Sequence, residues 1–162
     1  MRSGAWAVVW AAAGIVALFI EAAWRLALRG IITVRAGLDP MEWALLVVLA
    51  AAFVWGEGVR ALQRRWIPGV YRRIDALRDE TSITYRALAP LYAMSLIGAP
   101  RSTLARAWLG VVLIVAAVFI VRALPEPWRG IIDVGVAAAL TWGLIVLLYH
   151  SRLLVRRPNQ ET

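Results

Sequence analysis

Residues 41–60 read MEWALLVVLAAAFVWGEGVR, a nearly unbroken apolar stretch that ends in a carboxylate between two glycines. Its apolar part, about 41–59, has roughly the 20 residues that an α-helix needs to cross the hydrocarbon core of a bilayer. Similar runs occur at about 5–24, 104–121 and 130–150. The sequence therefore predicts an all-α, polytopic membrane protein with four transmembrane helices.

The composition favours the same class of protein. Hydrophobic residues make up 62% of the 162 residues, whereas a soluble domain has about half. The chain has no cysteine, which excludes disulfides, thiolate metal ligands and cysteine nucleophiles. The first run is longer than the apolar region of a signal peptide, so we expect a true span. One domain is enough for this length, and we treat residues 1–162 as a single membrane domain.

The net charge is +8, and all eighteen basic residues are arginines. If both termini and the stretch from Arg60 to Arg106 lie on one side, thirteen arginines lie there with them. The other five are Arg25, Arg29, Arg35, Arg122 and Arg129. Because positive loops stay in the cytoplasm, we expect a bacterial-type inner membrane with the N- and C-termini cytoplasmic. In so apolar a chain, the charge favours anionic lipids of the inner leaflet as partners, and no nucleic acid.

The links between the spans predict how the helices are arranged. The link RALPEPWRG between the third and fourth spans is short and proline-rich, which favours antiparallel neighbours. We therefore expect two antiparallel hairpins that form a small four-helix bundle. The link RGIITVRAGLDP after the first span is longer, and it either extends the first helix or lies along the outer interface.

The segment of about 60–103 is the one large part outside the spans. A broken helical stripe runs along it and predicts an amphipathic segment lying on the inner leaflet between the second and third helices. The stripe consists of Val70, Ile74 and Leu77, followed by Ile83, Leu88, Leu91 and Tyr92. The alternative is a segment that packs on its own bundle. On the interfacial interpretation, the candidates for contact with lipid headgroups are Arg64, Arg65, Arg72 and Arg73.

Glu57 is the leading candidate for an intramembrane ionisable group. It lies about 21 Å along the helix from Trp43 at a rise of about 1.5 Å per residue, so it is expected inside the membrane near the cytoplasmic edge. Arg60 follows at i+3, where it can neutralise Glu57 on the helix surface. The alternative is an ion or proton site, which Gly56 and Gly58 favour because they allow close helix approach or local unwinding.

Two further acids lie within spans. Ala13, Ala17, Glu21 and Arg25 recur every four residues and share one helix face. We expect that face to be buried against another helix, with Glu21 facing inward and paired with Arg25. Asp133 falls in the first turn of the fourth span, where the helix dipole favours an acid, so it is either a cap-region acid or a further ionisable site.

Helix contacts and chemistry complete the set of candidates. Gly135, Ala139 and Gly143 form a small-residue stripe, which predicts a packing surface against the third span, through Gly110, or against another subunit. His150 is the one histidine and lacks companion donors for a metal site. No catalytic motif is present, so we predict no catalytic residues, metal or cofactor, and an enzyme is the least favoured class.

Four short spans leave little room for a pathway within one copy, so we expect function to need copies of this chain or other membrane subunits. The intramembrane acids favour a transport component, either a homo-oligomeric channel or carrier or a subunit of a transporter. The alternative is a non-catalytic accessory subunit packed beside a larger redox or photosynthetic complex, because small-residue stripes and interfacial tryptophans suit helix packing without chemistry.

Overall fold

The structure is a computed structural model that describes residues 4–155, with side chains to Ser151. It is all-α, and the helices are α1 (Ala5–Ala36), α2 (Pro40–Phe53), η1 (Val54–Trp66), α3 (Ile67–Ala76), α4 (Ile83–Ala87), α5 (Ala89–Ala93), α6 (Arg101–Arg122) and α7 (Trp128–Val155). Helices α2, η1 and α3 form one continuous rod, Pro40–Ala76. When this rod is counted as one helix, four long helices in the described residues are apolar enough to cross a membrane. Four arginine side chains used above for orientation lie outside the described residues, namely Arg2, Arg152, Arg156 and Arg157.

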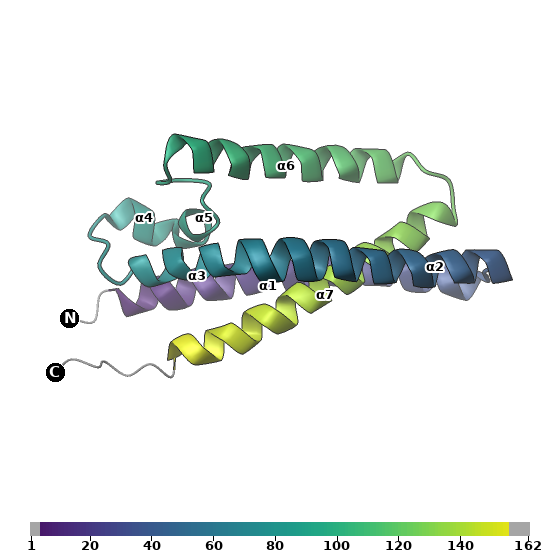
Figure 1. The fold of residues 1–162 in the computed structure, drawn as a ribbon, viewed down its shortest axis with the longest axis horizontal. Helices are drawn as coiled ribbons and strands as arrows, with labels where there is room; N and C mark the ends of the chain where they lie inside the picture. Colours follow the sequence, from purple (N-terminus) through teal and green to yellow (C-terminus); the bar gives the residue numbers. More distant parts are fainter. Residues whose placement is uncertain (1–3, 156–162) are drawn as a thin grey trace.

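The long helices alternate in direction, as the two predicted hairpins require (Figure 1). The start of α1 and the end of α7 lie at one end of the molecule, together with α3, α4 and α5. We call this the terminal end. The links 37–39 and 123–127 lie at the opposite end, which we call the loop end.

The first link is formed by local backbone chemistry. Gly37 has φ +95°, a left-handed conformation that glycine adopts without strain, and it ends α1. Asp39 then caps α2, since its side chain accepts the Glu42 N–H at 2.7 Å. The Glu42 side chain accepts the Asp39 N–H at 2.9 Å and completes a capping box, with Pro40 at the first helical position.

The helices run past the predicted spans. Helix α1 continues to Ala36 rather than ending near Trp24, so the first link extends this helix. The second rod continues to Ala76, and residues 60–76 thus belong to it rather than to a separate segment. At about 1.5 Å per residue, the 32 residues of α1 measure about 48 Å, against a hydrocarbon core of about 30 Å. This helix is thus longer than the hydrocarbon core is thick.

Helix α7 packs against both arms of the first hairpin. A Cβ at Gly135 would come within 2.7 Å of Phe53 on α2, and one at Gly143 within 2.8 Å of Leu62 on η1 and 3.0 Å of Phe19 on α1. The stripe of Gly135, Ala139 and Gly143 is buried and faces these helices. Nothing lies within 4 Å of a Cβ at Gly110, so α6 is not the partner of this stripe within the chain.

The largest hydrophobic core lies at the terminal end. Ile74 is 1% exposed, and Val70 and Leu77 are also buried there, against α1, α5 and α7. The first part of the stripe predicted to face the inner leaflet therefore packs on its own bundle, which was the alternative. The exposed apolar side chains of the segment come later, at Ile83, Leu88 and Leu91.

Helix α6 stands apart from the other three long helices (Figure 1). None of its residues is buried, although its sequence is apolar on all faces. Trp108 near its start donates a hydrogen bond to the Leu96 carbonyl at 3.3 Å. The predicted four-helix bundle is thus three packed helices with α6 beside them, because α7 leaves its hairpin partner to fill the space between α1 and the second rod.

Candidate functional site

Glu57 lies on η1, which is wound as a π-helix, with hydrogen bonds from residue i+5 to residue i. Gly58 is buried, and a Cβ there would lie 3.2 Å from Trp142 of α7. Gln63 accepts a hydrogen bond from Trp142 Nε1 at 3.0 Å, on the same side. Glu57 itself is exposed, so η1 presents Gly58 rather than the carboxylate to α7.

The contact with Trp142 also fixes the depth of Glu57. Trp142 lies 14 residues after Trp128 and 8 before His150, which is about 21 Å and about 12 Å along α7. Glu57 is therefore level with the middle of α7.

The expected surface pair between Glu57 and Arg60 is absent from the side chains that the structure describes. The pairing at i+3 assumed α-helical winding. A π-helix has more residues per turn, so residues three apart no longer lie on one face. Arg60 is exposed, as Glu57 is, and the two side chains leave η1 in different directions.

Glu21 forms the expected ion pair with Arg25, but the pair does not face inward. The two side chains are 57% and 75% exposed, respectively. Ala13 and Ala17 of the same face are exposed too. The expectation of an inward face was wrong because periodicity identifies residues that share a face without saying which neighbour covers it.

Glu21 and Glu57 lie at nearly the same depth. Phe19, two residues before Glu21, contacts Gly143, the residue that follows Trp142. Both carboxylates are thus level with one turn of α7, one on each arm of the first hairpin, and both are exposed. A charged side chain at this depth in a lipid-facing position costs about 2.5–3.5 kcal/mol on insertion scales.

Asp133 is a buried acid rather than a residue of the first helical turn. Because α7 begins at Trp128, Asp133 lies in its second turn, where it is 5% exposed. Its Oδ2 has no hydrogen-bond partner among the described side chains. The charges that act on it are Arg129, Arg29 and Glu126.

The residues around the loop end of α7, near Asp133, were not predicted as part of a site. Thr33 is buried, and its hydroxyl donates to Glu126 Oε2 at 3.1 Å across the loop end. An isolated threonine in an apolar run is a weak signal, and Glu126 belongs to a link. Only the close approach of α1 and α7 brings these groups together.

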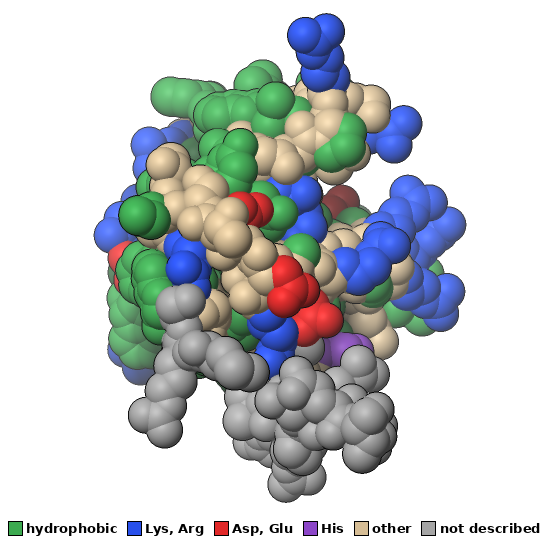
Figure 2. Space-filling view, turned by 90° about the vertical axis from the view of Figure 1, so that its left-hand side faces the viewer, with side chains coloured by type: hydrophobic (Ala, Val, Ile, Leu, Met, Phe, Trp, Pro, Cys, Tyr) green, Lys and Arg blue, Asp and Glu red, His purple; other side chains and the backbone are tan. Residues whose placement is uncertain are grey.

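The arginines predicted to contact lipid headgroups divide into two groups. Arg64, Arg65 and Arg72 are exposed, and Figure 2 shows arginine side chains spread around the terminal end. Arg73 instead turns to its own chain, where it donates to the carbonyls of Tyr92 at 2.6 Å and Ile97 at 2.9 Å. Its guanidinium also lies 4.0 Å from the centre of the Tyr92 ring. Arg73 thus holds the segment after α3 in place.

His150 is engaged within α7. Its Nδ1 lies 2.9 Å from the Val146 carbonyl, and its ring packs near Tyr71 and Tyr149. Across the described residues, no three His, Cys, Asp or Glu side chains gather in a way that could hold a metal ion.

Four apolar helices of sufficient length define the chain as a multi-pass membrane protein. Comparison of the chain with protein-family models, with curated proteins and with solved structures gave no match. Its function must therefore be argued from its own residues.

Proposed function

We propose that this chain is a membrane transport component that works as a homo-oligomer, with its conducting or carrying pathway between copies. The observation that carries the proposal is the position of Glu21, Arg25, Glu57 and Arg60, which are exposed on the outer faces of two helices at the depth of mid-α7. Ionisable groups within a membrane almost always face protein or a water-filled cavity, and they mark ion and proton pathways.

A pathway between copies is favoured over one within a single chain. Helix α7 fills the space between α1 and the second rod, where Gly58, Gly135 and Gly143 allow side chains to approach closely. The ionisable groups are exposed and take no part in this contact. When outer faces of neighbouring copies meet, the carboxylate of one copy can find an arginine of another, and water can replace lipid between them.

We further propose that the terminal end faces the cytoplasm of a bacterial-type cell, because most of the arginines lie there. Arg64, Arg65 and Arg72 are exposed at that end and suit the phosphates of anionic lipids. Arg73 is left out of this set because its guanidinium is engaged by Tyr92 and Ile97.

A second candidate function is that of an accessory subunit in a larger membrane complex, and the observation that favours it is α6. This helix has no buried residue and presents apolar side chains all round. A larger partner that packed on α6 would bury this helix. Glu21 and Glu57 would then serve only in packing between helices.

Flux measurements in liposomes test the transport proposal. Replacing Glu57 with glutamine is expected to change the flux of the transported ion at least about tenfold. Every 1.4 kcal/mol changes a rate tenfold, and the free-energy cost of a charged side chain within a membrane helix is larger than that. The flux of protons, sodium, potassium and chloride would be followed with dyes enclosed in the vesicles.

The matched control is Asp79→Asn, which removes the same charge from an exposed acid just after α3. We expect its flux to stay within about twofold of the unmodified protein, as for a surface change away from the site. Equal flux of all four ions through the unmodified protein, Glu57→Gln and Asp79→Asn would contradict a transport role for Glu57.

A further inference from the structure

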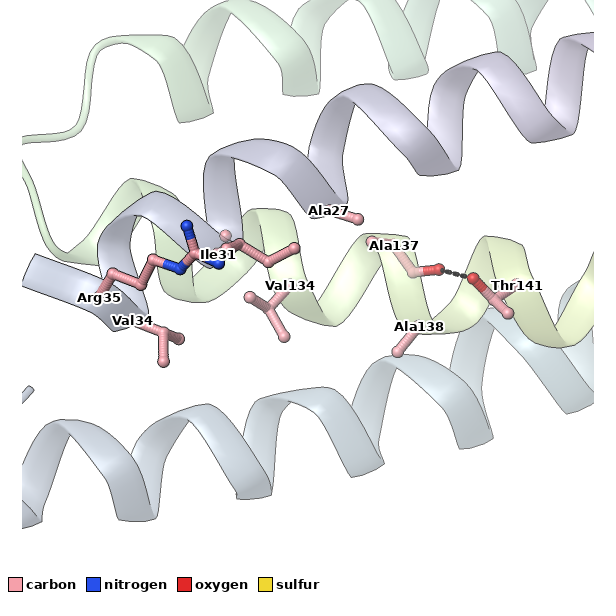
Figure 3. Close-up of a pocket in the computed structure, with 9 residues that line it drawn as sticks. Ala27, Ile31, Val34, Arg35, Val134, Ala137, Ala138 and Thr141 are labelled. Carbon is pink, nitrogen blue, oxygen red and sulfur yellow. Dashed lines mark hydrogen bonds between the residues drawn. The ribbon is translucent and has the colours of Figure 1, made fainter.

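An open groove of about 470 Å³ lies between α1 and α7, toward the loop end (Figure 3). Ala27, Ile31 and Val34 line it from α1, and Val134 and Ala138 line it from α7. Its volume falls within the range of about 300–1,000 Å³ that is usual for ligand pockets. It is separate from the acids of the proposed function, none of which lines it.

A glycine and several alanines, which carry no side chain or only a methyl group, create this groove. The backbones of α1 and α7 come close at Gly30, where a Cβ would overlap with Val134 Cγ2. Beside this contact, Ala27, Ala137 and Ala138 are too small to fill the space between the helices. The Thr141 hydroxyl at the far end donates to the Ala137 carbonyl at 2.8 Å. Water would find few polar partners along such a wall, so the groove suits an apolar occupant.

Arg35 gives the groove a charged entrance. It lies in the last turn of α1, its side chain is exposed, and Figure 3 shows it turned back along α1 in the direction of Ile31. No described carboxylate pairs with it. Arg35 lies eight residues after Ala27, which is about 12 Å at 1.5 Å per residue. The groove thus runs from a cation at the loop end into the apolar depth of the bundle.

We propose that this groove binds one acyl chain of a phospholipid from the leaflet at the loop end, with the lipid phosphate on Arg35. A guanidinium presents a planar fork of donors that matches phosphate oxygens, and the apolar wall below it matches a hydrocarbon chain. A helix fits less well, because a cylinder about 10 Å across and about 12 Å long occupies roughly 900 Å³. This lipid would seal the α1–α7 seam whatever the chain transports.

Native mass spectrometry of the full chain tests the proposal. Phosphatidylglycerol is titrated into protein held in a non-ionic alkyl glycoside detergent, and the first lipid adduct is counted. The detergent has an alkyl chain but no phosphate, and it is present in excess. A lipid adduct that forms in competition with the detergent therefore reports on the lipid phosphate as well as on the acyl chain. One saturable adduct is expected. Arg35→Gln is expected to weaken it roughly fivefold, and Ala138→Phe, which fills the groove, to abolish it.

Each variant has a matched control on α6. Arg122→Gln changes an exposed arginine in the last turn of another helix at the loop end, and Ala105→Phe enlarges an exposed alanine. Both controls are expected to keep the adduct of the unmodified protein. If Arg35→Gln binds the lipid as Arg122→Gln does, the proposed phosphate contact is wrong. If the first adduct persists in a folded Ala138→Phe protein, the groove is not the site. Because Arg35 is exposed, its variant is expected to fold and keeps the test decisive.

Discussion

Replacing Gly130 with alanine is expected to lower the free energy of unfolding by roughly 1–3 kcal/mol, the usual cost of overpacking a tight contact. A Cβ at this position would overlap with Oγ1 and Cβ of Thr33 and lie 2.7 Å from its Cγ2. Thr33 cannot easily give way, because it is buried and its hydroxyl is bonded to Glu126. The loss should appear although alanine favours a helix by about 1 kcal/mol over glycine.

The same substitution at Gly110 is the control for that measurement. Nothing lies within 4 Å of a Cβ there, so Gly110→Ala is expected to leave stability unchanged or raise it. Unfolding would be followed by tryptophan fluorescence as sodium dodecyl sulfate is titrated into mixed micelles. Equal midpoints for the two variants would mean that α1 and α7 do not meet at Gly130.

Replacing Ile74 with alanine is expected to cost about 2–5 kcal/mol in the same titration, as for other fully buried isoleucines. Ile74 is 1% exposed in the core at the terminal end, so its removal leaves a cavity that the neighbouring side chains cannot fill. The prediction separates the two interpretations of residues 60–103. A side chain that faced lipid would leave no cavity.

Ile120→Ala provides the comparison, because Ile120 on α6 is 66% exposed. We expect this variant to lie within about 0.5 kcal/mol of the unmodified protein. If Ile74→Ala behaves in the same way, residues 70–77 do not pack on the bundle.

The four spans could be predicted because each is a long apolar run, and length and hydropathy depend on local sequence alone. The neighbours of each span could not be predicted from the sequence. Helix α6 is apolar on every face, so its sequence carries no pattern that distinguishes a buried side from an exposed one. Lipid tails are as apolar as the interior of a protein. The contrast between an apolar and a polar face, which orients helices in soluble proteins, is therefore missing in a membrane.

The candidate site divides in the same way. The positions of Glu21 and Glu57 within the spans follow from counting residues, and the Glu21–Arg25 pair follows from i,i+4 spacing. The directions of these side chains depend on where α7 packs. For Glu57 they depend also on the π-helical winding of η1, for which Gly56 and Gly58 were the only local hint. In the predicted stripe, Val70, Ile74 and Leu77 share one buried face, whereas the later members Ile83, Leu88 and Leu91 are exposed. Periodicity does not distinguish a face that meets protein from one that meets lipid.

The outward acids and the isolated α6 both fit the proposed homo-oligomer. Glu21 and Glu57 would be costly against hydrocarbon, and the apolar surface of α6 is available for contact with a neighbouring chain. Neighbouring copies would meet both conditions at once, since α1, η1 and α6 all present uncovered faces.

The number of chains in one particle tests this account most directly. The protein would be extracted from its native membrane in polymer-bounded lipid discs, without detergent, and its mass measured against the 17.9 kDa of a single chain. For a homo-oligomer, one discrete species is expected whose protein mass is an integral multiple, at least twofold, of that value. A particle that holds one copy alone, or one copy beside larger subunits of different sequence, would contradict it.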